Sequence, residues 1–172
     1  MTRKILAALA ALCLAAGVAY AQDKPTDPQI AHIAYSAGVI DIEAAKQAIA
    51  KTQNAEVKAF AEGMVKDHEA VNVQALDLVK KLNVTPEDNA TSQALTKAGE
   101  DKRAELDKLD GAAFDKAYVD NEVAYHKTVN GALETLLVPS AQNAELKALL
   151  ETGLKLFQGH QHHAEMVAAK LQ

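Results

Sequence analysis

The chain has 172 residues, of which 49% are hydrophobic and 24% charged, and its formal net charge is −5. This composition is too apolar for a disordered segment, and the length corresponds to about one domain. Eight Gly and four Pro are too few for a turn-rich all-β sandwich, whereas the abundant Ala, Leu, Lys and Glu favour helix, so we predict an all-α protein.

Residues 1–21 have the pattern of a cleaved secretory signal peptide. Arg3 and Lys4 precede a long apolar run, and the segment ends in the small-x-small cleavage site Ala19-Tyr20-Ala21. We therefore expect a mature chain of residues 22–172 that forms a single helical bundle domain. The style of the signal is bacterial, which predicts a periplasmic or secreted protein.

The predicted mature chain is acidic. Loss of Arg3 and Lys4 leaves 16 basic against 23 acidic residues, so the formal charge changes from −5 to −7. Phosphate backbones and anionic membranes repel such a charge, and we expect no nucleic acid partner. No later segment approaches the roughly 18 consecutive apolar residues that span a bilayer, so no membrane insertion is expected after signal cleavage. Cys13 is the only cysteine and is lost with the signal, which excludes thiol chemistry and disulfides in the mature chain.

The first two predicted helices form a hairpin. Apolar residues recur at intervals of three and four from residue 28 to about residue 51, which is the period of a core-facing helix. Asp27 and Pro28 have the residue types of an N-cap and a first helical position. Asn54 then caps a second helix that extends to about residue 82. Only two or three residues connect the two helices, so we expect them to be antiparallel neighbours.

The second half of the chain repeats this layout after a long connection. The pattern weakens over residues 83–111, which we interpret as a crossover with one modest helix. A third long helix is predicted over residues 112–137, ended by Val138-Pro139-Ser140, and a fourth over residues 142–171. The segment QNAEVKA, which opens the second helix, returns as QNAELKA at the fourth. Two antiparallel hairpins joined by a long crossover predict a ferritin-like antiparallel four-helix bundle.

Five residues with metal-binding side chains fall on the apolar faces of these helices, counted at about 100° per residue. Each of the four long helices contributes at least one: Asp41, His68, Glu122 with His126, and His160. Bundles build metal sites in this way, and burying such groups without partners is costly. Imidazole and carboxylate together suit iron, zinc, manganese or copper as the cofactor.

A metal-free polar cluster is the alternative interpretation of the same residues. Asp41 would then accept hydrogen bonds from one or two histidines, and Tyr118 or Tyr125 would complete the network. At about 1.5 Å per residue, the first hairpin's candidates lie roughly 17 and 23 Å from their turn, and the second hairpin's histidines roughly 21 and 30 Å from theirs. This spread exceeds one coordination sphere unless the turns lie a few residues from their predicted positions. His32 and His162 are predicted to face solvent.

The chain resembles the family of exported ferritin-like proteins known as domain of unknown function 4142, over roughly residues 29–171. The resemblance rests on VIDIE at residues 39–43, on EVKAFA leading to MVKDH at residues 56–68, on FDKAY leading to His126, and on ELKA leading to His160. The spacing of the Asp-His pair after EVKAFA is its most specific part. The resemblance implies a four-helix fold and export, and it implies no established activity.

The chain lacks the sequence pattern of ferritin-like di-iron proteins. No Glu has a His three residues later, so we expect no standard di-iron oxidase or ferroxidase centre and assign no catalytic residues. Two functions stay open. The first is an exported metal-binding or redox-stress protein, with His68, His126 and His160 as ligands and Asp41 or Glu122 as the carboxylate. The second is a non-catalytic helical binding or stress-protection module, in which a metal-free polar cluster only fixes the register of the helices. The sequence identifies no protein partner.

Export predicts that the mature protein begins at Gln22. Signal peptidase cuts after a small residue, so the intact mass of periplasmic or secreted material should correspond to residues 22–172. Mass spectrometry of that material checks the prediction, and Ala21→Phe should leave the leader attached because it removes the small residue at the cut. Mature material that retains Met1 would contradict the prediction.

Overall fold

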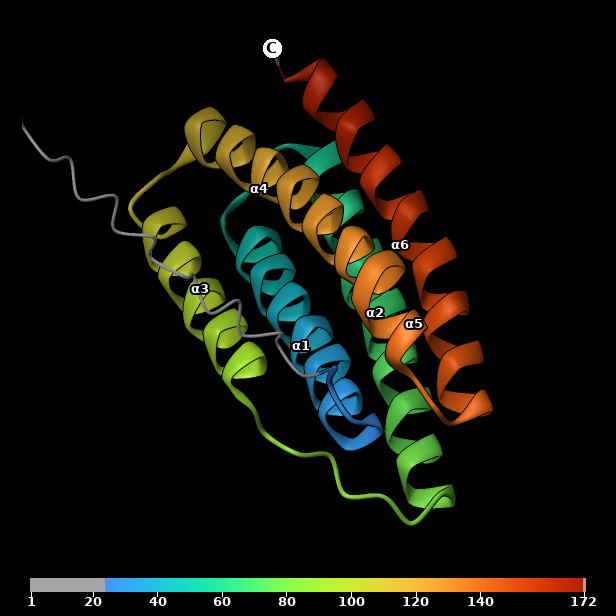
Figure 1. Cartoon of the computed structure of the whole chain (residues 1–172). Coiled ribbons are helices and arrows are strands. Elements are labelled where there is room, and N and C mark those ends of the chain that lie inside the picture. The colour runs from blue at the N-terminus through green and yellow to red at the C-terminus, as the bar shows by residue number, and fades with distance from the viewer. Residues whose placement is uncertain (1–23, 172) are drawn as a thin grey trace, which may run out of the picture.

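The computed structural model describes residues 24–171, and the predicted signal peptide of residues 1–21 lies outside the described residues. Four long helices form the body of the molecule (Figure 1): α1 (Asp27–Lys51), α2 (Ala55–Lys81), α4 (Gly111–Ala132) and α6 (Ala144–Lys170). A shorter helix, α3 (Ala90–Leu106), packs against the outside of α1. No strand forms within residues 24–171, and the fold is the predicted all-α, ferritin-like antiparallel bundle with a crossover helix.

The long helices pair as two hairpins, α1 with α2 and α4 with α6. Three residues, 52–54, connect the first pair, in agreement with the short turn that the sequence predicts. The repeated QNAE segments are two equivalent helix starts. The side chain of Asn54 accepts hydrogen bonds from the backbone N–H groups of Glu56 and Val57, and Asn143 accepts them from the corresponding two residues of α6. Each asparagine thereby satisfies two N–H groups that have no partner within the helix.

The start of α1 differs from the prediction by one residue, because Thr26 is the N-cap in place of Asp27. Thr26 and Gln29 form a capping box, in which each side chain accepts a hydrogen bond from the other's backbone N–H. The carboxylate of Asp27 instead accepts hydrogen bonds from the backbone N–H groups of Gln142 and Asn143, both at 2.8 Å. It therefore ties the start of α1 to the start of α6, where the helix dipole favours negative charge.

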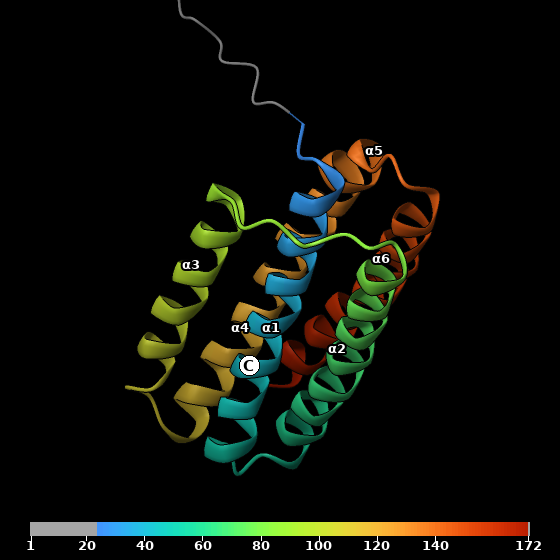
Figure 2. The same cartoon turned by 90° about the horizontal axis from the view of Figure 1, so that it is seen from below.

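The crossover runs the length of the bundle, because α2 ends and α4 begins at opposite ends of it (Figures 1 and 2). Asn83 has a positive φ of 52° where the chain leaves α2, a conformation that asparagine tolerates better than most residues. Polar contacts help to hold α3 to α1. Among them, Arg103 forms a 2.6 Å ion pair with Glu43, and Gln47 donates a hydrogen bond to the carbonyl of Arg103. The predicted modest helix is thus a fifth helix outside the four-helix body.

The end of α4 also differs from the prediction. The chain does not leave the helix at Val138 but continues through a single π-helical turn, η1 (Leu133–Leu137), into the short α5 (Val138–Ser140). The N–H of Val138 donates to the carbonyl of Leu133, five residues earlier. Pro139 lies in the first turn of α5, where its missing N–H costs little. A π turn absorbs one extra residue, and the apolar period of the sequence does not reveal it.

The apolar core divides into two clusters with a polar layer between them. One cluster includes Phe60, Phe114 and Tyr118, and the other includes Ile30 and Leu150. On every long helix the predicted site residues lie between the segments that supply the two clusters. The polar layer therefore crosses the middle of the bundle. Within residues 24–171, no helix combines the length and apolar character needed to cross a membrane.

Asp27→Ala should lower the free energy of unfolding by about 1–3 kcal/mol, because two backbone N–H groups lose a charged acceptor. Urea unfolding followed by circular dichroism measures the change. Asp120→Ala is the matched control: Asp120 forms an exposed ion pair with Lys116, and such pairs contribute about 0–1 kcal/mol. Equal losses in the two variants would show that Asp27 does not tie the hairpins together.

Candidate metal centre

All five predicted site residues lie together in the polar layer. Asp41, His68, Glu122, His126 and His160 have exposed fractions between 1% and 5%. The large spread estimated from helix depths does not occur. The connecting residues 52–54 and 141–143 lie outside the helices and add no helical rise, and the side chains reach across the remaining separation. Each of the four long helices therefore contributes at least one residue to this layer, as the sequence predicts.

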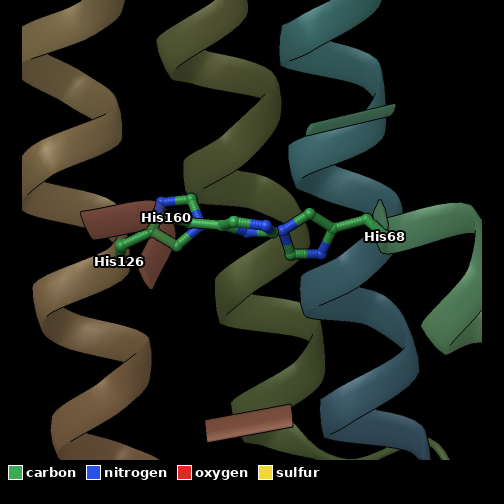
Figure 3. A group of neighbouring side chains, drawn as sticks. All are labelled: His68, His126 and His160. Atoms are coloured by element: carbon green, nitrogen blue, oxygen red, sulfur yellow. The ribbon is translucent and has the colours of Figure 1, made fainter. Parts of the chain in front are cut away.

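The three histidines come from α2, α4 and α6 and form one cluster (Figure 3). Their ring centroids are 5.7 Å apart for His68 and His126, 5.2 Å for His68 and His160, and 5.4 Å for His126 and His160. One ring nitrogen of each lies within 4.8 Å of one ring nitrogen of both others. The cluster is therefore compact enough for one small cation to reach all three rings after a slight contraction.

Hydrogen bonds at the back of two rings fix which nitrogen carries a free lone pair. Nδ1 of His126 lies 3.0 Å from the backbone carbonyl oxygen of Glu122. A carbonyl can only accept, so Nδ1 is the protonated donor and Nε2 carries the lone pair. Nε2 of His160 similarly donates to a carboxylate oxygen of Asp67 at 3.1 Å, which leaves its Nδ1 free. Neither free nitrogen has a hydrogen-bond partner among the described residues.

The ring of His68 is held by stacking. It lies almost parallel to the ring of Phe157, with centroids 4.7 Å apart and an interplanar angle of 6°. Neither of its ring nitrogens has a hydrogen-bond partner within residues 24–171, although the side chain is only 4% exposed. Buried polar atoms are normally paired, so this ring is oriented by packing while its hydrogen-bonding capacity is unused.

Two carboxylates border the imidazoles. Oδ2 of Asp41 lies 3.4 Å from Nε2 of both His68 and His126, and Oε2 of Glu122 lies 3.7 Å from Nδ1 of His126. Asp41, Glu122 and His126 also form a second group whose potential ligand atoms all lie within 4.8 Å of one another. The predicted metal-free network is incomplete, because both carboxylate oxygens of Asp41 lack a hydrogen bond from any described residue.

Burial keeps the imidazoles neutral. It lowers the pKa of His68 to about 2, with further contributions from His126 and His160, and it lowers the pKa of His126 to about 4. The pKa of His160 is also lowered by burial, although its hydrogen bond to Asp67 opposes the shift. At neutral pH all three rings therefore have the uncharged form that can donate a lone pair to a metal.

Burial raises the pKa values of the two carboxyl groups, whereas it lowers those of the imidazoles. Burial raises the pKa of Asp41 to about 7. Burial, with the neighbouring Asp41 carboxylate as a smaller cause, raises the pKa of Glu122 well above its ordinary value. Two buried carboxylates without a cation hold on to protons because neither charge is compensated. A bound cation would supply that compensation.

The sequence does not predict the contact between Asp67 and His160. The position of Asp67 beside His68 predicts a solvent-facing side chain, yet its carboxylate accepts the hydrogen bond from His160 while remaining 37% exposed. Only its position at the edge of the apolar face of α2 could have indicated this contact.

The two tyrosines do not complete the metal-free hydrogen-bond network that the sequence suggests as an alternative. The Tyr125 hydroxyl donates to the carbonyl of Ala37, and the Tyr118 hydroxyl has no partner among the described residues.

The solvent-facing histidines differ in their exposure. The side chain of His162 is 73% exposed, and that of His32 is 30% exposed at a distance of 3.9 Å from Asp88. Neither belongs to a group with metal-binding spacing within residues 24–171. Variants of these two histidines can therefore serve as controls for variants of the buried histidines.

Fold and side chains together define a ferritin-like helical bundle with three imidazoles and two carboxylates in its interior. The chain belongs to the DUF4142 family, a domain of unknown function, whose family model matches residues 14–167. The family resemblance drawn from the motifs is thereby confirmed. None of the curated proteins compared with the chain matches it.

A solved structure shares the fold. The chain is similar to the crystal structure of a predicted secreted protein, DUF305, from Streptomyces coelicolor, with a TM-score of 0.71 and 11% sequence identity. The match covers 83% of this chain and 91% of that chain. At this identity the likeness concerns the helical architecture, so the chemistry of the polar layer depends on the residues described above.

Asp41→Asn should stabilise the metal-free protein in a pH-dependent way. The pKa of Asp41 is about 7 in the folded chain against 3.8 for the free side chain. The folded state therefore keeps a proton that the unfolded state loses, and stability falls as pH rises from about 4 to 7, by at most about 1.4 kcal/mol per pH unit. Above pH 7 both states are ionised and the penalty is constant. The advantage of Asn should grow over this range and then level off.

Urea unfolding in the presence of a chelator, at intervals from about pH 5 to pH 8, measures the difference between the two proteins. Asp120→Asn, on the surface of α4, should show little pH-dependent difference. An Asp41→Asn advantage that stays constant across this range would show that the Asp41 pKa is not raised.

Proposed function

We propose that the protein is an exported metal-binding protein that holds one divalent transition-metal ion in the polar layer. His68, His126 and His160 would supply three nitrogen ligands and Asp41 a carboxylate oxygen. The observation that carries this proposal is the convergence of three buried, neutral imidazoles from three helices, with one ring nitrogen of each within 4.8 Å of one ring nitrogen of the other two. A purely structural role for histidine does not require three imidazoles to lie this close together.

The unpartnered atoms favour a metal over a metal-free polar cluster. A cluster that only fixes helix register should pair its own donors and acceptors, because each unpaired buried group destabilises the fold. Seven of the twelve unpaired buried side-chain atoms among the described residues belong to the five site residues: both carboxylate oxygens of Asp41, both ring nitrogens of His68, Oε2 of Glu122, Nε2 of His126 and Nδ1 of His160. A cation held by the three imidazoles would use a lone pair of each ring, and its charge would compensate the neighbouring carboxylates.

Asp41 lies close enough to two of the imidazoles to share a metal ion with them. Zn²⁺ binds nitrogen and oxygen ligands at about 2.0–2.1 Å, so neighbouring ligand atoms in a tetrahedron are about 3.3–3.4 Å apart. The separations of Asp41 Oδ2 from Nε2 of His68 and of His126 are both 3.4 Å. Among iron, zinc, manganese and copper, a site with three imidazoles favours zinc and copper(II), since manganese prefers oxygen ligands.

The surroundings of the ligands have the features of a supported metal site. Metal-binding histidines usually donate their second N–H to a carboxylate or a backbone carbonyl, which orients the ring and raises its basicity. Asp67 would have this role for His160, and the Glu122 carbonyl for His126. Four protein ligands would close the coordination sphere, as in structural zinc sites. This favours binding and storage of the metal, in a stress-related role, over catalysis.

Export of the protein rests on its N-terminal sequence. The charged start, apolar run and small-x-small site of residues 1–21 have the features that direct a chain out of the cytoplasm. The structurally similar Streptomyces coelicolor protein is itself a predicted secreted protein. The proposed location is the periplasm or the outside of the cell, where a metal-binding protein would act on metal that has not yet entered the cytoplasm.

Metal titration of the tag-free mature protein tests the proposal. Zinc or copper(II) should bind with a stoichiometry of one and raise the unfolding temperature, and His68→Ala should lower the affinity at least 10-fold because the coordination sphere is incomplete. His162→Ala is the matched control, since its ring is exposed and lies outside the cluster. Isothermal titration calorimetry and thermal unfolding measure both effects.

The same experiment separates the two functions. In the metal-free alternative, His68→Ala leaves a cavity and lowers stability, but no metal changes the unfolding temperature of either protein. Asp41→Asn keeps the shape of the side chain and serves as a second ligand variant if His68→Ala does not fold. Equal and negligible stabilisation of wild type and variants by all four metals would rule out the metal centre.

A further inference from the structure

One flank of the polar layer is left uncovered by the crossover helix. Along the bundle axis, apolar clusters lie on both sides of the layer, and a cation that crossed them would lose its hydration without gaining partners. Around the layer, α3 packs on α1 and contacts α4, whereas α2 and α6 meet on the opposite side of the bundle (Figures 1 and 2). A lateral path through this α2–α6 interface therefore avoids both apolar clusters and α3.

A carboxylate at the α2–α6 interface connects the layer to solvent. The side chain of Asp67 on α2 is 37% exposed, and it accepts a hydrogen bond at 3.1 Å from Nε2 of His160 on α6. The side chain of His160 is itself only 7% exposed, and its Nδ1 has no partner among the described residues. The ring of His126, in contrast, is held by the carbonyl of the buried Glu122. His160 is thus an imidazole of the cluster whose hydrogen-bond partner reaches the surface.

Two ion pairs fix the register of α2 and α6. Lys170 on α6 pairs with Glu56 on α2, and Glu145 on α6 pairs with Lys81 on α2. The two pairs are 25 residues apart along both helices, as expected for antiparallel helices in constant register. Residues at equal distances from the Glu56 pair on the two helices therefore lie opposite each other.

This register places two glycines opposite the polar residues of the interface. Gly159 and Asp67 are each 11 residues from the Glu56 pair, and Gly63 lies seven residues from it, as does His163. The exposed ring of His163 lies 5.1 Å from the ring of Phe60 on α2, which confirms that these faces meet. Apart from its own helix backbone and chain neighbours, a Cβ at either glycine would meet no atom of the described residues within 4 Å.

Close packing does not explain these two glycines. Glycine inside a helix destabilises it relative to alanine, so its presence there usually has a local reason. At Gly38 and Gly99 the reason is a close neighbour, because a Cβ would lie 2.3 Å from the carboxamide oxygen of Asn72 and 2.6 Å from the side chain of Ile40, respectively. The glycines of the α2–α6 interface instead leave free space next to an exposed carboxylate.

From this arrangement we propose that a divalent transition-metal ion enters the polar layer through the α2–α6 interface, and that Asp67 takes the ion from solvent and passes it to His160. The inference rests on the proposed metal function and deepens it, because it names how the buried site is filled. A carboxylate attracts a hydrated cation and can replace part of its water before the ion is buried. The space beside the two glycines leaves room for the ion to pass between the helices.

The rates of metal capture and release separate entry from orientation of the ring. Zinc capture by the metal-free mature chain, and its release into excess EDTA, are followed by stopped flow with a chromogenic chelator, with copper(II) in its place if the chain binds only copper. Asp67→Asn keeps an oxygen that can accept from His160 but removes the charge, so capture should slow by about 5-fold or more. Asp120→Asn is the matched control, since it removes an exposed charge of α4 and should leave capture unchanged.

Gly63→Leu and Gly159→Leu fill the proposed path without touching a ligand. Each should slow capture and release by the same factor, about 10-fold or more, because a narrower path hinders both directions and leaves the bound state unchanged. Gly131→Leu is the matched control: it is a helical glycine of α4 at which a Cβ also meets no described atom within 4 Å. It should leave both rates unchanged. The circular dichroism spectrum reports folding, and Asp67→Asn tests the proposal if a Leu variant does not fold.

Capture rates that equal those of the wild type in Asp67→Asn and in both interface Leu variants would overturn the proposal. So would a loss of affinity that arises from faster release alone, since that result is expected if Asp67 only orients His160. A chain that binds neither zinc nor copper(II) would overturn the metal centre as well. The two failures are therefore distinguishable.

Discussion

The burial of ionisable side chains halfway along the bundle is the constraint on which the rest of the structure depends. A hydrophobic core would be more stable with aliphatic residues at these positions, because burying polar groups without partners is costly. Asp41, Glu122 and three histidines occupy them instead, and burial shifts their pKa values in opposite directions. Near neutral pH the site therefore presents neutral imidazoles next to two carboxyl groups, of which Asp41 is near the midpoint of its titration and Glu122 keeps its proton. A bound cation would favour the loss of both protons.

The remaining fold keeps this layer in position. Asp27 joins the two hairpins at one end, and α3 covers α1 along its outer face. The two apolar clusters lie on either side of the layer and supply the hydrophobic stabilisation that the layer itself does not provide. Asp67 and the Glu122 carbonyl then select the tautomers of two rings. The site consequently has preset lone pairs, which lowers the cost of ordering ligands when a cation binds.

The histidine rings have two kinds of surroundings within the bundle. On one side of His68 and His126 lie carboxylate oxygens, and on the other lie aliphatic side chains and the ring of Phe157. The ring of His68 lies flat against that of Phe157, with an interplanar angle of 6°.

The sequence by itself determined the helices, the crossover and the five interior polar residues, because the apolar period and the capping asparagines are local features of the chain. It did not determine that Asp27 binds the backbone at Gln142 and Asn143, that a π turn extends α4, or that Asp67 turns towards His160. These features depend on contacts between residues far apart in the chain. Helical periodicity gives the direction of a side chain but not its height relative to other helices, so only the tertiary structure decided that the three imidazoles meet.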